Sequence, residues 1–251
     1  MFSEASTFFM TMDIEKETHL GDWKLKLEDN PSFHISVDCV IFGYQDNVLK
    51  VLLMESDIPQ YKGKLSLLGT LLQSDQTLRQ AAQKVLLDST SLSEVYLEQV
   101  EAFSAIERHP FGRVITIAYF SLIIISQYEI QDHTGNELRW VPVSELNQMA
   151  FDHNEIVDKC LSVLRKKLRE CPIGFNLLPR KFSLKQLQGL YECVLGMKLD
   201  KRNFRRKLNS LDVLIDLNES QDSVAHRPAK LYCFDHAKYR QKAAQGVRFE
   251  L

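Results

Sequence analysis

The sequence lacks any apolar run close to the roughly 20 residues that a membrane-spanning helix needs, so we expect no membrane association. Its five cysteines are odd in number and lack metal-type spacing, which argues against a disulfide framework and favours reduced, buried thiols. No basic segment precedes the short apolar patch at residues 8–10, so we expect no signal peptide. These absences predict a cytoplasmic protein.

Acidic groups are scarce near the C-terminus. Residues 172–251 hold 15 Lys and Arg but 8 Asp and Glu, whereas residues 1–171 hold 16 basic and 25 acidic groups. With 251 residues and 45% hydrophobic content, the chain can bury a large core, and we expect one large and one small domain. An acidic body with a basic C-terminal module predicts that only the module binds a polyanion.

Residues 200–211 combine a helical period with a high density of cations. Phe204, Leu208 and Leu211 recur at helical spacing and predict a buried stripe, and Asp200 stands at the N-cap position. Five Lys and Arg within seven residues repel one another, and a row of phosphates relieves that repulsion. A solvated surface helix is the alternative interpretation. The residues that we predict to contact DNA here are Lys201, Arg202, Asn203, Arg205, Arg206 and Lys207.

The neighbouring stretches complete a winged helix-turn-helix. Ser183 and Gln186 form a capping-box pair at the start of an amphipathic helix that Gly196 ends. Strand-like runs at 213–217 and 231–234 follow the basic helix and enclose a polar loop. In this arrangement the second helix enters the major groove and the wing meets the DNA backbone. The wing adds three candidate DNA contacts: His226, Arg227 and Lys230.

Upstream of this module, strands and helices alternate. Residues 1–32 show no sustained hydrophobic period, and the alternation of apolar residues that is typical of a strand begins at residue 33. The alternation predicts an α/β or α+β body that ends near residue 171. Strand-like runs cover 33–41, 48–54, 96–106, 114–125 and 138–143, and helical periodicity marks 77–88 and 156–168.

Several motifs in this body resemble the Nudix fold, among them the segment 67–72 and the apolar positions of 78–92. Together with 174–179 and 200–207, they make the chain similar to the Nudix-related transcriptional regulators (NrtR-like), and especially to their sugar-responsive, AraR-type branch. The resemblance implies an α+β protein: a Nudix-fold α/β/α sandwich followed by a C-terminal winged helix-turn-helix. The expected domains are an N-terminal extension (1–32), a degenerate Nudix, ligand-sensing domain (33–154), a connecting helix (155–171) and a winged helix DNA-binding domain (172–251).

The Nudix box itself is degenerate. A Nudix hydrolase needs a Gly, then a Glu, then an Arg-Glu-x-x-Glu-Glu cluster whose carboxylates hold divalent cations. Registering the chain on its apolar residues puts Thr70, Gln76 and Lys84 at the Gly, the first Glu and the Arg, and Val85, Asp88 and Ser89 at the clustered carboxylates. Shifting by one residue, with Gly69 as the Gly, gains Asp75 but not the cluster. Several converging carboxylate oxygens are needed for such a cation, so we predict no catalytic residues, no metal and no cofactor.

A Nudix domain of this kind on a DNA-binding module predicts a pocket that senses a small polar effector. The resemblance implies a pentose such as arabinose, with ADP-ribose or a related nucleotide as the alternative. The candidate effector contacts, from the stretches that match the family, are Glu107, Arg108, Arg113, Tyr119, Asp152 and His153. Ordinary structural roles remain open for each: a surface ion pair, a core residue or a helix cap.

The leading hypothesis is a ligand-responsive transcriptional regulator of sugar catabolism that binds a palindromic duplex operator as a homodimer. Two other classes stay open: a Nudix hydrolase with a displaced metal site, and a non-enzymatic RNA-binding or scaffold protein. Metal-dependent turnover would identify the first alternative. Preference for a defined duplex sequence separates a regulator from the second.

Overall fold

The computed structural model describes residues 33–93, 95–127, 137–221, 228–246 and 249 of the chain. Contacts between residues divide the chain into two units, Met1–His34 and Ile35–Leu251. The large sheet and the winged helix both belong to the second unit.

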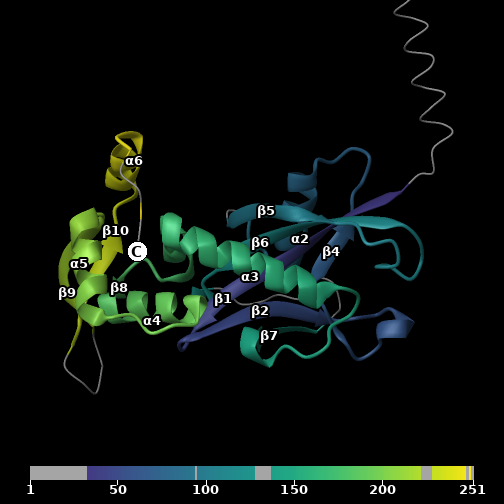
Figure 1. The fold of residues 1–251 in the computed structure, drawn as a ribbon, viewed down its shortest axis with the longest axis horizontal. Coiled ribbons are helices and arrows are strands. Elements are labelled where there is room, and N and C mark those ends of the chain that lie inside the picture. The colour runs from purple at the N-terminus through teal and green to yellow at the C-terminus, as the bar shows by residue number, and fades with distance from the viewer. Residues whose placement is uncertain (1–32, 94, 128–136, 222–227, 247–248, 250–251) are drawn as a thin grey trace, which may run out of the picture. The chain divides into compact units, whose positions relative to one another are not determined.

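A seven-stranded sheet occupies the centre of the body in the described part of the chain (Figure 1). Its strand order is β3-β2-β1-β6-β5, with β4 paired to β1 and β7 paired to β2. Asp46 and Asn47 make the two-residue turn between β1 and β2 with φ of 52° and 61°, a left-handed conformation that these residues tolerate well. The strands are β1 (His34–Gln45), β2 (Val48–Glu55), β3 (Leu65–Ser66), β4 (Leu68–Leu71), β5 (Tyr96–Phe103), β6 (Val114–Ile123) and β7 (Leu138–Pro142).

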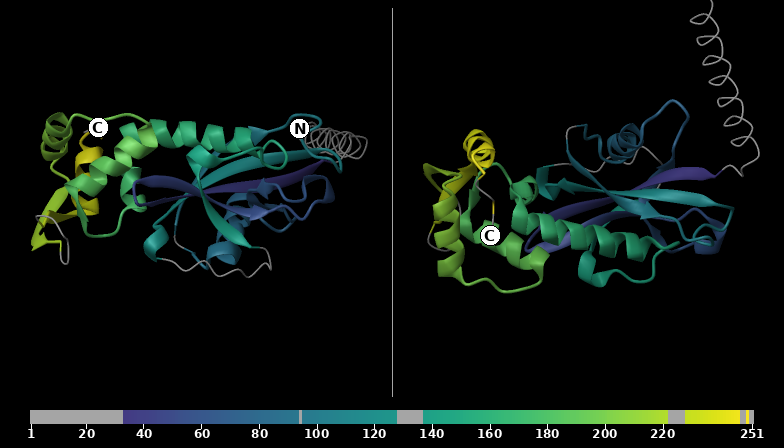
Figure 2. Two further views of the ribbon diagram at one scale, coloured as in Figure 1. Left: turned by 90° about the horizontal axis from the view of Figure 1, so that it is seen from below. Right: turned by 45° about the horizontal axis from the view of Figure 1, so that its top comes forward.

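Successive residues of β1 point to opposite faces of the sheet, and both faces are buried. Val37, Cys39 and Ile41 belong to the core under helix α2 (Leu78–Thr90), whereas Val40 and Phe42 belong to the core under helix α3 (His153–Glu170). Figure 2 shows the two helices on opposite sides of the sheet. The expected α/β/α sandwich is therefore confirmed.

The C-terminal module has the element order of a winged helix. Helices α4 (Leu184–Leu195) and α5 (Lys201–Leu211) precede a three-stranded sheet of order β8-β10-β9. Ser183 and Gln186 form the capping box of α4, and Gly196 ends that helix with φ of 67°. The strands are β8 (Phe182–Ser183), β9 (Leu214–Ser220) and β10 (Lys230–Phe234), and helix α6 (His236–Ala244) follows them.

The apolar core under α3 continues into the winged helix. Leu164 and Leu168 near the end of α3 belong to the same buried cluster as Phe175, Leu190 and Phe204. Four short 3-10 turns complete the described elements: η1 (Pro59–Tyr61), η2 (Ile125–Gln127), η3 (Val143–Glu145) and η4 (Pro172–Leu177). The helices within the described ranges include none that is both long enough and apolar enough to cross a membrane.

The five cysteines all lie in described positions and form no disulfide. Cys39 and Cys160 are buried, and burial raises the pKa of the Cys160 thiol to about 12. These two thiols therefore remain protonated core groups, as predicted, whereas Cys171, Cys193 and Cys233 are half-buried.

Candidate functional site

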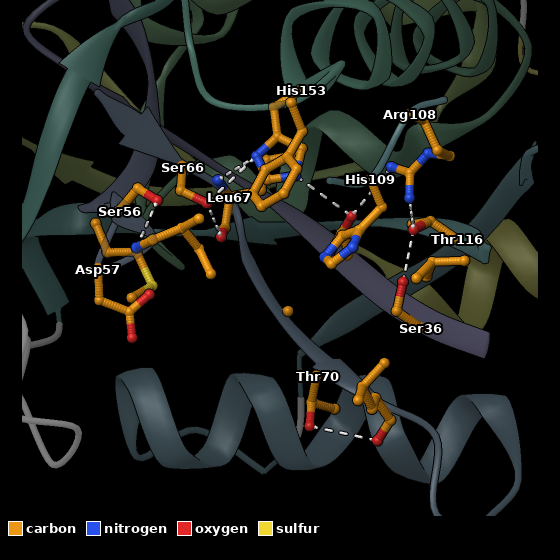
Figure 3. A pocket seen from close by; sticks show the side chains of 17 residues that line it. Ser36, Ser56, Asp57, Ser66, Leu67, Thr70, Arg108, His109, Thr116 and His153 are labelled. Carbon is orange, nitrogen blue, oxygen red and sulfur yellow. Dashed lines mark hydrogen bonds and ion pairs between the residues drawn. The ribbon is translucent and has the colours of Figure 1, made fainter. Parts of the chain in front are cut away.

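A pocket of about 340 Å³ opens between the start of β1, strand β4, the loop before β6 and the start of α3 (Figure 3). Hydroxyl, carboxylate, guanidinium and imidazole groups share its wall with apolar side chains. The lining comprises Ser36, Asp38, Met54, Ser56, Asp57, Ile58, Ser66, Leu67, Gly69, Thr70, Leu71, Arg108, His109, Val114, Thr116, Phe151 and His153.

Arg108 is the cation of this wall, and its side chain is 3% exposed. Its Nε and Nη2 donate to the two carboxylate oxygens of Asp152 at 2.8 and 2.6 Å. Its Nη1 donates to the hydroxyl oxygen of Thr116, which in turn shares a hydrogen bond with Ser36. Two parallel charge-assisted bonds fix the guanidinium plane and offset part of the cost of burying the charge.

His153, the first residue of α3, lies on the same side of the pocket, and both it and Arg108 approach Oδ2 of Asp38, at 3.5 and 3.9 Å. Its Nδ1 accepts a hydrogen bond from the backbone N–H of Leu67 at 3.0 Å, so the neutral ring carries its proton on Nε2. That Nε2 lies 3.5 Å from Oδ2 of Asp38. Asp38 fits because Gly69 pairs with it across β1 and β4: a Cβ at Gly69 would lie 2.0 Å from Oδ1 of Asp38.

Aromatic rings form the outer part of this wall. Phe151 stacks on His109 with ring centroids 5.2 Å apart and planes 11° apart, and it also contacts the rings of Tyr61 and His153. Lys64 lies over the Tyr61 ring, 5.8 Å from its centroid. Phe151 has φ of 52°, a conformation that a non-glycine residue adopts only where its surroundings hold it. The pocket therefore joins a polar cluster to a half-exposed aromatic surface.

Three of the six predicted effector residues, Arg108, Asp152 and His153, come together here. Glu107 is exposed and lies outside the pocket lining, while Arg113 donates to the carbonyl oxygens of Ser104 and Ala105. Tyr119 is 2% exposed in the core under α2, where its hydroxyl donates to Gln99 at 2.8 Å, and burial raises its pKa. Sequence reasoning placed Tyr119 in the pocket because it ignored the period of β6, which turns this ring to the α2 face.

Sequence reasoning also missed Ser36, Asp38 and Thr116. Asp38 had a usable signal, because it is an acid inside an otherwise apolar strand, where an unpaired carboxylate is costly. Ser36 and Thr116 had none: they lie 80 residues apart in sequence and meet through the strand pairing.

The positions that the family resemblance assigns to the Nudix carboxylates have other roles. Val85 is 6% exposed in the core under α2. Ser89 is buried and donates its hydroxyl to the carbonyl oxygen of Val85, and Asp88 pairs with Lys84 at 2.8 Å on the exposed side of the helix. In the described part of the chain, no group of three or more His, Cys, Asp and Glu side chains could hold a metal ion.

Helix α5 provides the second candidate site. Asp200 caps it by accepting from the backbone N–H of Asn203 at 2.8 Å, and Phe204 and Leu208 are buried as predicted. All six predicted DNA contacts of this helix are exposed. Among the described residues, its five cations form no ion pair with an acidic side chain. These cations are Lys201, Arg202, Arg205, Arg206 and Lys207.

Of the three wing residues predicted to contact DNA, Lys230 lies in the described part of the chain, and its side chain is exposed. Lys230 donates to Oδ2 of Asp216 at 3.0 Å, so its charge is paired within the wing, and this contact raises its pKa. His226 and Arg227 lie outside the described residues.

A hollow of about 770 Å³ lies beside α5, and four cations share its wall. Lys201 and Arg205 come from α5, Lys185 from the start of α4 and Lys198 from the turn. Lys185 and Lys198 were not predicted. Lys198 is paired with Glu192 of the same wall at 3.4 Å, so Lys185 is the one that extends the positive surface toward α4. Asn47, from the β1–β2 turn, also lines this hollow.

The body has three layers, and a winged helix follows it. The cations of α5 in this winged helix form no ion pair with a described acidic side chain. Together these features define a Nudix-related, DNA-binding transcriptional regulator. Residues 174–234 match the model of the NrtR DNA-binding winged helix domain. The chain is 34% identical over 211 residues to the "ADPR responsive transcriptional repressor NtrR" of Acinetobacter baylyi, covering 82% of this chain and 84% of that protein. The chain therefore belongs to the NrtR family.

The chain is also similar to a solved NrtR structure, which agrees with this assignment, and to a hydrolase. The structure of Shewanella oneidensis NrtR complexed with a 27mer DNA matches 86% of this chain and 97% of that chain, with a TM-score of 0.73 and 27% identity. An ADP-ribose pyrophosphatase of Methanocaldococcus jannaschii is 26% identical over 144 residues, covering 57% of this chain and 80% of that protein. The expected family is confirmed; a place in its AraR-type branch receives no support.

Proposed function

We propose that the protein is a transcriptional repressor whose Nudix domain binds ADP-ribose or a closely related nucleotide and thereby controls operator binding. The observation that carries the proposal is the combination of an unpaired cationic face on α5 with a buried polar pocket in the body. The ADPR-responsive relative from Acinetobacter baylyi supports this effector class.

The DNA part of the proposal rests on the geometry of α5. Its apolar stripe packs on the winged helix, so its cations face solvent and meet no competing carboxylate among the described side chains. Such a helix fits the major groove, and Lys185 extends the surface for adjacent phosphates. We propose a homodimer that presents two copies of α5 about one DNA turn apart, roughly 34 Å, on a palindromic operator.

The effector part follows from the two halves of the pocket. The cluster of Asp38, Ser36 and Thr116 can accept from and donate to the hydroxyls of a ribose. Phe151 offers aromatic surface for a base, and Lys64, which lies over the neighbouring Tyr61 ring, adds positive charge near the pocket for a diphosphate. ADP-ribose contains all three parts.

A free pentose is the second candidate, because the polar cluster has more hydroxyl partners than free cations. Ser36, Ser56, Ser66 and Thr116 line the pocket, and Arg108 is already paired with Asp152. ADP-ribose ends in a ribose, so the same cluster serves either ligand, and the comparisons favour the nucleotide.

We also propose that the domain does not hydrolyse its ligand. Val85, Asp88 and Ser89 occupy the positions of the expected metal carboxylates and are committed to the core, to Lys84 and to the backbone. We also propose that the N-terminal extension ends at 32, the Nudix domain at 154 and the connecting helix at 171. A cytoplasmic location belongs to the same proposal.

Fluorescence anisotropy on duplex DNA from the protein's own upstream region tests this proposal. We expect sequence-preferred binding that weakens with salt and that ADP-ribose reduces, whereas arabinose and xylose leave it unchanged. ADP-ribose should also raise the melting temperature of the free protein. Equal affinity for scrambled DNA contradicts the regulator, and a response to the pentose alone assigns the second candidate. Turnover of ADP-ribose with Mg²⁺ or Mn²⁺ that disappears in Asp88→Ala contradicts the non-catalytic role.

A further inference from the structure

Two of the elements that supply polar groups to the pocket, β1 and α3, also lead to contacts with helix α4 far from the pocket. Strand β1 brings Ser36 and Asp38 to the pocket near its start, and α3 brings His153 at its first residue. The strand has 12 residues and the helix has 18, so both extend well beyond the pocket. Their far ends are where a change at the pocket can reach the winged helix.

The turn that ends β1 lies directly on the backbone of α4. A Cβ at Gly189 would lie 2.7 Å from Oδ1 of Asn47 and 3.2 Å from the hydroxyl oxygen of Tyr44. Tyr44 donates to that same Oδ1 at 2.9 Å, which fixes the turn. A methyl group at 189 would therefore push the side chains of Asn47 and Tyr44 away from α4. In Figure 1 the β1–β2 hairpin ends beside α4.

Helix α3 contacts the C-terminal end of α4, whereas the hairpin contacts its middle. Nε of Arg165 donates to the carbonyl oxygen of Val194 at 2.8 Å. Val194 lies in the last turn of α4, where backbone carbonyls lack a partner within the helix. The same guanidinium borders Gly196, which ends α4: a Cβ there would lie 3.8 Å from Nη2. Arg165 therefore holds the C-terminal end of α4.

Helix α4 in turn holds the helix that we expect to read DNA. The rings of Tyr191 and Phe204 pack with centroids 5.6 Å apart, joining α4 to α5. Glu192 accepts from the backbone N–H of Leu199 at 2.9 Å, which fixes the turn between them. A displacement of α4 is therefore passed to α5.

We propose that β1 and α3 together transmit effector binding to the winged helix, with Gly189 and Arg165 as the positioning residues. This inference rests on the proposed function and describes how effector binding regulates operator binding. A ligand that contacts Asp38 and His153 changes how β1 and α3 sit relative to each other. Helix α4 follows, because the hairpin fixes it at Gly189 and Arg165 fixes it at Val194.

The test compares operator affinity with and without saturating ADP-ribose in Gly189→Ala and in Arg165→Ala. Couplings between sites are typically about 5- to 150-fold, and we expect the ratio to fall to within about twofold of 1 in both variants. Lys166→Ala is the matched control: it removes an exposed cation one residue further along α3 and keeps the wild-type ratio. ADP-ribose should still raise the melting temperature of both variants without DNA. A folded Arg165→Ala protein with the wild-type ratio overturns the proposal.

A second measurement needs no effector, because coupling between two sites is reciprocal. Operator DNA should change amide hydrogen exchange at 68–71 in β4 and at 44–48 in the hairpin in the wild type, and less so in Gly189→Ala. If ADP-ribose has no effect on the wild type, the assigned effector is wrong, and this measurement decides the mechanism alone. Unchanged exchange at both segments on DNA binding overturns it.

Discussion

The guanidinium of Arg108, which lines the pocket, donates to both carboxylate oxygens of Asp152, at 2.6 and 2.8 Å. Arg108 comes from the loop before β6, and Asp152 precedes α3, so the pair joins two elements that are 44 residues apart. It fixes the start of α3 and, with it, the position of His153.

Asp152→Asn should destabilise the protein by about 1.5–3 kcal/mol, because the buried guanidinium loses the carboxylate that it bonds directly and keeps Asp38, whose Oδ2 lies 3.9 Å from Nη2. Urea unfolding measures the change. Asp88→Asn is the control: it breaks the exposed Lys84–Asp88 pair and should cost between about 0 and 1 kcal/mol. Equal, small losses in the two variants would show that the buried pair contributes no more than a surface one.

Asp200→Ala should lower the stability of the winged helix by about 1 kcal/mol, because the first turn of α5 loses the acceptor for the N–H of Asn203. Operator affinity should fall with it, since Lys201 and Arg202 lie in that turn. Asp200→Asn keeps a capping oxygen and should behave like the wild type in both assays. A loss of the same size in the Asn variant would point to the charge rather than the cap.

Arg206→Ala should weaken operator binding by about 1–3 kcal/mol if the side chain reads a base, with reduced preference for the operator over scrambled DNA. If it meets a phosphate instead, the slope of log K against log salt should fall by about 0.9 while the preference stays. Anisotropy at several salt concentrations separates the two outcomes. Lys166→Ala, with its charge on α3, should change neither quantity, and binding unaffected by Arg206→Ala removes α5 from the interface.

Glu192 makes stability depend on acid pH. The N–H of Leu199, and next the side chain of Gln188, lower the pKa of this carboxyl below its ordinary value of 4.5. Above that ordinary value the ionised group stabilises the fold, and its contribution is lost as the pH falls through the lowered pKa. Glu192→Gln should therefore be less stable at neutral pH and show a shallower loss below pH 4.5. Urea midpoints across that range measure it, and parallel curves for the two proteins would refute the assignment.

Local patterns predicted the helices well. The Ser183–Gln186 capping box, the Gly196 end and the Asp200 cap need only neighbouring residues, and all three are confirmed. Helix α6 was missed because none of its residues is buried, so it has no apolar stripe. Strand β4 was missed because its four residues are too short a run to show a period.

The pocket was predicted less completely, because its residues meet only through tertiary contacts. Arg108 and Asp152 were found through family motifs, whereas Asp38 depends on the register that places it opposite Gly69. Tyr119 shows the reverse error: its motif was noticed, but the direction of its side chain is set by strand alternation and not by sequence proximity.

The apolar core shared by α3 and the winged helix affects how this protein can be cut or recombined. A fragment that begins at residue 172 would lose Leu164 and Leu168, which belong to the same buried cluster as Leu190 and Phe175. Heating should melt both parts in one calorimetric transition, and a chimera with a foreign winged helix needs a matching C-terminal half of α3. Operator specificity in this protein is therefore best re-engineered by substitutions on the exposed surface of α5. Such substitutions leave the apolar core between α3 and the winged helix intact.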